Sequence, residues 1–389
     1  MNGRERLLAT LRGQRADRMP VAPFLYYNSV YEMFGYEPEI DTFWDPPDFD
    51  PIQKFVEYCD FFGFDILHTL GSVWDFGVRS FGDRGVVQSS ENWDVTLVDE
   101  ASSDGLHRTV SVRTPKGELR HSENYKRSSK HLVVSAPEEH FIKTQHDFDL
   151  LREYGPPGDD MDCSLIQRAV LAVGEKGLVD ANTGGVFATA SGFRKLDELY
   201  QDPMLDESFY REMMAYFLER TIRRDRKMVE AGADVIEVAG HLVGSMVGPR
   251  FAGRYVMEYE QQLVKAIREM GVPVIFHNCG DAARVMHLYN DLEINCWGYL
   301  TPPPFGDVDL DEALAVMRPD MALRGNIDQV EFMVTATPEQ VKERVRDVVQ
   351  KVKPRGNWIL STTDFFFDGT PYENIRAFAE AGQKYGEYC

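Results

Sequence analysis

The sequence predicts an α/β protein, a (β/α)8 TIM barrel with an antiparallel β insertion near its N-terminal third. The first observation is that eight short apolar runs alternate with amphipathic helical stretches, as in parallel strands joined by helices. The second is that residues 71–145 break this alternation. An open doubly wound sheet shows the same alternation and is the alternative. We interpret residues 1–389 as one barrel domain that contains a β-rich insertion at 71–145.

The predicted strands are short and rich in branched apolar residues, as expected of strands buried on both faces. They are Met19–Tyr26, Asp65–Leu70, Leu178–Ala190, Asp234–Ala239, Val272–Cys279, Cys296–Leu300, Met321–Gly325 and Trp358–Thr362. Clear helices are predicted at Asp206–Ala231, Gly253–Met270 and Thr337–Val352. The last of these opens with Thr337-Pro338-Glu339, a typical helix start.

The insertion contains alternating segments, Trp93–Val98 and Thr109–Arg120, in place of helices. Pro115-Lys116-Gly117 interrupts the second of them and predicts the turn of a β-hairpin. We expect an antiparallel sheet on one face of the barrel rather than an independent domain.

Composition excludes several classes of function. The chain has 389 residues, of which 43% are hydrophobic, and a net charge of -21. So acidic a protein repels nucleic acid and anionic lipid, and no apolar run is long enough to span a bilayer. The N-terminus does not look like a secretory signal, and five scattered cysteines favour reduced thiols. We therefore expect a cytoplasmic protein without a nucleic-acid or membrane partner.

Chemistry in a barrel of this type lies at the C-terminal ends of the strands. His277 and Cys279 stand two positions apart at the end of one predicted strand, so their side chains share a face. An imidazole and a thiol placed in this way can bind a borderline metal such as Zn²⁺. A core histidine beside a buried free cysteine is the alternative interpretation.

Polar groups also follow other predicted strands. Glu237 lies inside an apolar run, where a carboxylate is costly unless it is paired or coordinates a metal. Either it pairs with Arg324 of a neighbouring strand or it is a metal ligand. Asn326 follows the seventh strand, and Asp364 precedes the aromatic run Phe365–Phe367 after the eighth. Asn and Asp often begin loops, so a polar residue after a single strand is weak evidence for a site. Polar residues after several strands are stronger evidence.

Several segments together resemble the uroporphyrinogen decarboxylase superfamily, which includes zinc- and corrinoid-dependent methyltransferases of O-demethylase and coenzyme M methyltransferase type. The resemblance runs nearly end to end and implies a TIM barrel with its active site at the C-terminal face. The segments that carry it are Arg4–Gly13, Asp17–Val21, Leu196–Pro203, Ala231–Asp234, Gly325–Asp328 and Gly369–Ile375.

The branch of the superfamily is indicated by missing arginines. True uroporphyrinogen decarboxylases carry an arginine-rich segment after the first strand, which binds a substrate with eight carboxylates. Here Tyr26–Tyr31 occupies that region, and no arginine lies between Arg18 and Arg79. Carboxylates without cations to meet them would bind poorly. The resemblance therefore favours the methyltransferase branch.

The resemblance also implies a zinc site. The methyltransferase branch binds zinc with a His-x-Cys pair, matched here by His277 and Cys279, and usually with a further cysteine after the eighth strand. In this chain that position falls on or near Asp364, and no cysteine lies between Cys296 and Cys389. We expect Zn²⁺ to be bound by His277, Cys279 and Asp364, with Glu237 as a candidate fourth ligand. The absence of any bound metal is the alternative.

The implied function is transfer of a methyl group from a small methylated substrate to a corrinoid carried by a partner protein. Methyl ethers of phenols are one fitting substrate class, because their departing oxygen needs a Lewis acid or a proton donor. The catalytic candidates are Tyr26, Tyr27, His241 and Asn326, and the substrate-binding candidates are Trp74, Arg324, Phe365 and Phe366, with Trp93 as a further part of an apolar wall.

Two other functions remain open at this point. One is a metal-independent decarboxylase or lyase of a small acid, with Arg324 or Arg79 binding the carboxylate. The other is a barrel without chemistry that binds a ligand or partner. A homodimer is also compatible with the sequence.

Overall fold

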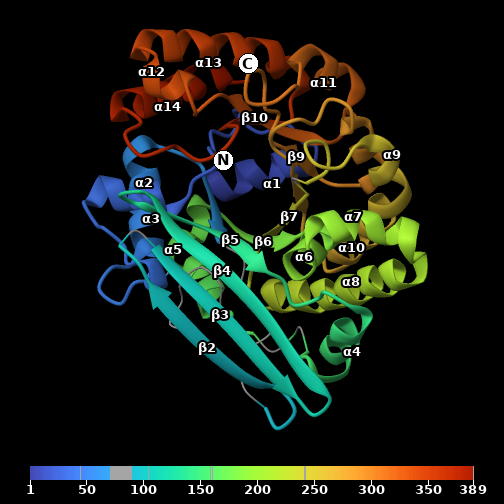
Figure 1. Ribbon diagram of the computed structural model, residues 1–389. Coiled ribbons are helices and arrows are strands. Elements are labelled where there is room, and N and C mark those ends of the chain that lie inside the picture. The colour runs from blue at the N-terminus through green and yellow to red at the C-terminus, as the bar shows by residue number, and fades with distance from the viewer. Residues whose placement is uncertain are drawn as a thin grey trace.

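The computed structural model describes residues 1–43, 45–70, 90–103, 105–157, 159, 161–240 and 242–388. Its central feature is a parallel sheet in the order β1-β6-β7-β8-β9-β10-β11, surrounded by helices (Figure 1). The α/β fold predicted from the sequence is thus confirmed. The strands are β1 Ile66–Leu70, β6 Gly177–Gly184, β7 Val235–Ala239, β8 Val274–His277, β9 Cys296–Gly298, β10 Ala322–Ile327 and β11 Trp358–Thr362.

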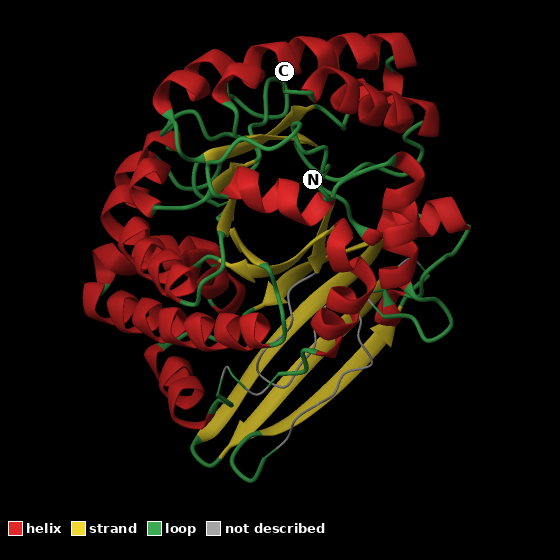
Figure 2. Ribbon diagram, turned by 180° about the vertical axis from the view of Figure 1, so that it is seen from behind, coloured by secondary structure: helices red, strands yellow, loops and turns green. Residues whose placement is uncertain are grey.

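The first predicted strand, Met19–Tyr26, is an extended segment rather than a strand. Val21 makes a single parallel bridge with Leu360 of β11, and its carbonyl accepts a hydrogen bond of 2.9 Å from Asp65 N, just before β1. Pro23 has no N–H with which to extend a ladder, which is why the pairing stays short. The segment nevertheless lies between the two edge strands, so the sheet curls into a barrel (Figure 2) rather than a doubly wound sheet.

The helices that surround this sheet include those predicted from sequence. The long helix at 206–231 is confirmed, and the one at 337–352 begins with a capping box on Thr337. The helix at 253–270 begins with a π-helical turn at Ala252–Val256. The α-helices are α1 Gly3–Leu11, α2 Tyr27–Phe34, α3 Pro51–Phe62, α4 Gln145–Tyr154, α5 Ser164–Val173, α6 Val186–Phe193, α7 Leu196–Leu205, α8 Glu207–Glu230, α9 Pro249–Phe251, α10 Met257–Glu269, α11 Leu310–Val316, α12 Phe332–Thr335, α13 Pro338–Val352 and α14 Tyr372–Gly386. No described helix is both long and apolar enough to cross a membrane.

The predicted insertion forms a separate antiparallel sheet that projects from the barrel (Figure 1). Its strands are β2 Asp94–Ala101, β3 Gly105–Thr114, β4 Gly117–Ser129 and β5 Leu132–Glu139, paired in that order. The hairpin predicted at Pro115-Lys116 is confirmed, because Thr114 and Gly117 pair across it. Trp93, just before β2, is 1% exposed and packs into the core.

The N-terminal end of the barrel is closed by α1, which lies across the opening (Figure 2). Its Leu7 and Leu11 pack against one apolar residue from each strand and from the extended segment. This floor consists of Ala22, Leu67, Leu178, Val235, Ile275, Cys296, Ala322 and Ile359. Because side chains alternate along a strand, the residues two positions further on also point inward and form the next layer.

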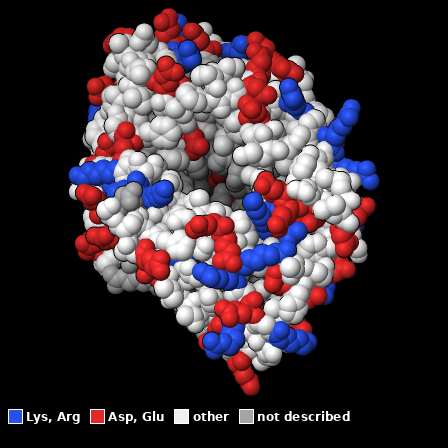
Figure 3. Space-filling model, in the orientation of Figure 1, with Lys and Arg blue, Asp and Glu red and all other residues white. Residues whose placement is uncertain are grey.

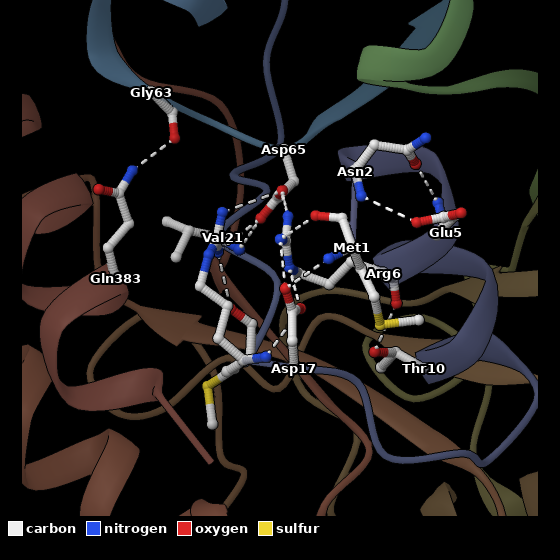
Figure 4. Close-up of polar contacts among 12 residues, drawn as sticks. Met1, Asn2, Glu5, Arg6, Thr10, Asp17, Val21, Gly63, Asp65 and Gln383 are labelled. Atoms are coloured by element: carbon white, nitrogen blue, oxygen red, sulfur yellow. Dashed lines mark hydrogen bonds and ion pairs between the residues drawn. The ribbon is translucent and has the colours of Figure 1, made fainter. Parts of the chain in front are cut away.

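A network of charges joins α1 to the extended segment (Figure 4). Arg6 ion-pairs with both Asp17 and Asp65, and Arg18 donates to Asp65 at 2.8 Å. The same Asp65 accepts a hydrogen bond from Val21 N at 2.9 Å. Hydrogen bonding to Arg6 holds the pKa of Asp17 well below its usual range. The network fixes the chain as it passes from the helix into the barrel wall.

The predicted strand Leu178–Ala190 is wrong in its second half. The strand β6 ends at Gly184, and α6 begins at Val186. The buried Glu260 carboxylate of α10 accepts hydrogen bonds of 3.2 Å from Val186 N and from Phe187 N, and so caps the helix. A cap supplied by a residue more than seventy positions away leaves no local signal in the sequence.

We expect this cap to make stability depend on pH. Burial raises the pKa of Glu260 to about 7. The folded protein therefore binds the proton more tightly than the unfolded chain, so the contribution is complete below about pH 4.5 and is lost as the pH rises through 7. The loss should be about 3 kcal/mol, since one pKa unit is worth about 1.4 kcal/mol.

Glu260→Gln should remove this dependence, because an amide oxygen can still accept while the group no longer ionises. Urea unfolding of both proteins between pH 4 and 8 measures it. Glu258→Gln is the control, since Glu258 lies on the same helix with a side chain that is 57% exposed. Parallel stability curves for the wild type and Glu260→Gln would contradict the prediction.

Candidate functional site

The second inward layer of the barrel, one step above the apolar floor, is polar. It contains two carboxyl groups, a guanidinium and an imidazole. Its described members are Phe24, Asp180, Glu237, His277, Gly298, Arg324 and Ser361. The space-filling view shows a hollow in the centre of the face seen in Figure 1 (Figure 3). We call Asp180, Glu237, His277 and Arg324 the interior cluster.

Glu237 is the centre of this cluster and is 0% exposed. Its carboxylate accepts hydrogen bonds from four side chains, which are His277 Nδ1 at 2.8 Å, Arg324 Nη1 at 3.3 Å, Asn182 Nδ2 at 3.4 Å and Tyr299 Oη at 3.5 Å. The Asp180 carboxyl group also hydrogen bonds to it. Burial alone would raise the pKa of Glu237, but the charges of His277 and Arg324 hold it below its ordinary value.

The pairing of Glu237 with Arg324, one of the two alternatives drawn from the sequence, is confirmed. The strands β7 and β10 are not neighbours, however, because β8 and β9 lie between them. The ion pair therefore crosses the interior of the barrel instead of joining adjacent strands.

Arg324 is enclosed on all sides and is 0% exposed. Its Nη2 donates to Ala22 O at 3.3 Å, and its guanidinium lies 4.6 Å from the centre of the Tyr299 ring. This placement makes Arg324 the counter-ion of Glu237 and leaves it no surface for the substrate-binding role that we expected.

His277 and Cys279 do lie together, at the end of β8. The His277 ring is held on one side by Glu237, and it packs edge-on against Phe24 and Tyr299, with ring centres 5.4 and 4.8 Å away. The Cys279 thiol, which is partly exposed, is a further hydrogen-bond partner of the ring. Burial alone would lower the pKa of His277, but the Glu237 carboxylate raises it well above its ordinary value.

An aromatic wall stands at the mouth of the barrel. Tyr26 and Phe365 are stacked, with ring centres 5.1 Å apart and planes at 24°, and Phe24 lies 6.1 Å from Tyr26. Burial, with the nearby Asp364 charge, raises the pKa of Tyr26. Burial likewise raises the pKa of Asp364, whose Oδ1 accepts from Phe365 N at 2.8 Å. Tyr26, Asp364 and Phe365 are thus brought to one side of the mouth.

The loop that carries Asp364 and Phe365 is fixed by contacts with the antiparallel sheet. Asp368 accepts hydrogen bonds from Ser129 Oγ at 2.6 Å and from the backbone of His131 at 3.0 Å, at the β4–β5 turn. It also accepts from Asn28 Nδ2 at 3.2 Å. The insertion therefore helps to hold one wall of the candidate site.

Asn326 is the last but one residue of β10, in register with Ser361 of β11. It is 8% exposed, and its Oδ1 has no hydrogen-bond partner in the described part of the chain. A buried amide oxygen without a partner is costly, so this acceptor is a point where a donor on a bound molecule would be stabilised.

Other predicted site residues lie elsewhere. Tyr27 packs against Phe55 and points its hydroxyl at His68, with 3.4 Å between the two atoms, away from the interior cluster. Phe366 is 1% exposed and packs its ring against Phe378 of α14. Trp74, Arg79 and His241 lie outside the described residues.

Sequence reasoning missed four residues of the site. They are Phe24, Asp180, Asn182 and Tyr299. A usable signal existed for Asp180, because it is a charged residue inside an apolar run, as Glu237 and Arg324 are. Tyr299 and Phe24 gave none, since aromatic residues at strand ends are usual in any core.

Zn²⁺ in proteins is bound by three or four His, Cys, Asp or Glu side chains, and the candidate site can be compared with this requirement. Among the described residues, no group of three or more His, Cys, Asp or Glu side chains is arranged to hold a metal ion. His277 and Cys279 are a suitable pair of donors, and a carboxylate on the second ring nitrogen is the usual companion of a metal-binding imidazole. The oxygens of Glu237 are already hydrogen bonded. His277 and Cys279 therefore suit zinc as a pair of donors, but the described residues do not place a third His, Cys, Asp or Glu ligand beside them.

The comparison with known families agrees with the resemblance seen in the sequence. The model of the uroporphyrinogen decarboxylase (URO-D) family matches residues 137–385. The chain belongs to the URO-D family. Among its relatives, a methylated-thiol–coenzyme M methyltransferase of Methanosarcina mazei is 28% identical over 137 residues, which are 35% of this chain and 34% of that protein. A uroporphyrinogen decarboxylase of Prochlorococcus marinus is 25% identical over 193 residues, which are 48% of this chain and 50% of the relative.

A longer match is to the methylcobamide:CoM methyltransferase MtbA of Methanosarcina mazei, 23% identical over 252 residues, which are 63% of this chain and 70% of that protein. The first two matches thus cover only a third to a half of the relatives' lengths. The solved structure of a methyltransferase from Methanosarcina mazei superposes over 99% of both chains with a TM-score of 0.71 and 15% identity, which supports the fold of this URO-D family member.

Proposed function

We propose that this URO-D family member is a methyltransferase that moves a methyl group from a small methylated substrate, such as a phenyl methyl ether, to a corrinoid carried by a partner protein. The observation that carries the proposal is the line Cys279–His277–Glu237 at the inner end of an aromatic mouth. Relatives named as methyltransferases of methylated thiols and methylcobamide support this branch of the family.

The described residues suit the binding and orientation of an aryl substrate. Tyr26 and Phe365, together with Phe24, offer ring faces against which an aromatic ring can stack. Asn326 offers an unpartnered acceptor to a neighbouring hydroxyl group. This wall would hold the carbon–oxygen bond near His277 and Cys279.

The reaction breaks the bond between methyl carbon and oxygen, and the oxygen departs with the electron pair while the methyl group passes to the reduced cobalt of the corrinoid. The departing oxygen must be stabilised or protonated. When bound by His277, Cys279 and Asp364, Zn²⁺ would supply a Lewis acid for it. Tyr26, at the same mouth, is placed to donate a hydrogen bond to this oxygen, since burial keeps its hydroxyl protonated.

A decarboxylase or lyase of a small acid is the second candidate, and the uroporphyrinogen decarboxylase relatives favour it. Its cation would have to be other than Arg324, which is fully buried against Glu237.

The test is methyl transfer by the full chain to free cob(I)alamin under anaerobic conditions, with 2-methoxyphenol as donor. We expect methylcobalamin in the absorption spectrum and release of the demethylated phenol. Uroporphyrinogen is the parallel substrate. Its conversion to coproporphyrinogen, without any methyl transfer from a panel of aryl methyl ethers and methylated thiols, would contradict the proposal.

We predict that Asp364→Ala lowers zinc affinity, whereas Asp364→Cys retains or tightens it, because thiolate is the softer and stronger donor. Methyl transfer should fall in both, in the alanine variant through lost metal and in the cysteine variant through a weaker Lewis acid. Chelator competition measures the affinities. Asp311→Ala is the control, since Asp311 is an exposed carboxylate of α11 that pairs with Lys351. An Asp364→Ala protein with full zinc and full activity would return Asp364 to a loop-capping role.

A further inference from the structure

The carboxylate of Glu237 is immobilised more completely than a simple ion pair requires. One oxygen, Oε1, accepts from His277 Nδ1 at 2.8 Å and from Asn182 Nδ2 at 3.4 Å. The other, Oε2, accepts from Arg324 Nη1 at 3.3 Å and from Tyr299 Oη at 3.5 Å. Both oxygens are therefore occupied by donors from the walls of the barrel.

This arrangement determines how the His277 ring is presented. A carboxylate can only accept, so Nδ1 must carry a proton whether the ring is neutral or charged. Nε2 is then the nitrogen that remains for Cys279 and for anything bound at the mouth. Phe24 and Tyr299 pack against the ring and prevent it from turning over.

We infer that Glu237 is a positioning residue: it fixes the ring orientation and the Nδ1–H form of His277, and Arg324 holds Glu237 in place for this task. Glu237 thus acts through His277 rather than as the fourth metal ligand expected from the sequence. The inference rests on the proposed function only where metal binding is concerned, because the orientation of the ring exists without metal.

Nitrogen-15 NMR of histidine in the zinc-free full chain tests the orientation. The signals of His277 are those that disappear in His277→Gln. We expect Nδ1 to be protonated in the wild type, with a slowly exchanging proton. Glu237→Ala should shift the population toward the Nε2–H form, and Glu237→Gln should largely preserve Nδ1–H, because the amide oxygen can still accept.

Zinc affinity gives the second readout. Loss of a carboxylate that orients a ligating histidine typically costs 10–100-fold in metal affinity. We expect a loss in that range for Glu237→Ala and a smaller one for Glu237→Gln. The matched control is Glu123→Gln, since Glu123 is a buried glutamate of the antiparallel sheet, hydrogen bonded to Tyr125. It should leave zinc affinity and the His277 signals unchanged.

The outcomes separate this inference from the proposed function. An unprotonated Nδ1 in the wild type overturns the inference, whatever the metal content, and needs no variant to fold. Unchanged His277 signals in a folded Glu237→Ala protein also overturn it. If no variant and no wild-type protein binds zinc while Nδ1–H is present and lost in Glu237→Ala, the metal part of the proposed function fails and the positioning role stands.

Discussion

Replacement of Arg324 by methionine should lower the free energy of unfolding by about 3–5 kcal/mol. Arg324 and Glu237 are both 0% exposed, and Arg324 is the permanent cation of the interior cluster. Removal of one member of a buried ion pair leaves the other as an uncompensated charge in a poorly solvated interior, which accounts for the size of the effect. Guanidinium-induced unfolding at pH 7 measures it.

The double variant Glu237→Gln/Arg324→Met distinguishes the lost charge balance from lost packing. With both charges removed, the penalty for the uncompensated carboxylate disappears, so the double variant should be more stable than Arg324→Met alone. A single variant within about 1 kcal/mol of the wild type, or a double variant with strictly additive losses, would show that the two side chains are energetically independent.

His277→Ala and Cys279→Ser should each remove most of the zinc and reduce methyl transfer by at least about 100-fold, because too few protein ligands then remain for tight binding. Elemental analysis after zinc reconstitution and the cob(I)alamin assay measure the two effects. Cys163→Ser is the control, since this cysteine lies just before α5 and hydrogen bonds to Lys227 O. Full zinc and full activity in Cys279→Ser would exclude the thiol from the site.

The parts of the fold that the sequence predicted well are those set by local periodicity. The alternation of strands and helices predicted the barrel, and the turn at Pro115-Lys116 predicted the hairpin. The predicted strand at 178–190 failed because Val186 and Phe187 suit a strand and a helix equally, and the choice was made by Glu260 from another helix. The first predicted strand makes only one β-bridge. Whether an extended segment pairs with neighbouring strands depends on its position in the tertiary structure and not on its β propensity.

The candidate site was predictable in its components but not in its geometry. His277 and Cys279 share a face because the period of a strand is fixed. In contrast, a run of aromatic residues does not reveal which of them faces the mouth. The sequence therefore could not distinguish Tyr26 from Tyr27, nor show that Phe366 packs away from the site. Tyr26 lies at the mouth while Tyr27 points at His68, since α2 begins between them.

The apolar floor has a consequence for electrostatics. Leu7 and Leu11 pack over the barrel one residue layer below Glu237, so apolar side chains lie beneath the charges. Charge–charge interactions weaken in proportion to the effective dielectric constant around them. By lowering the effective dielectric constant beneath the site, the helix α1 therefore strengthens the interactions among the charges of the interior cluster. A polar substitution such as Leu7→Ser would weaken the hold of Arg324 on Glu237 while leaving every charged residue of the barrel in place.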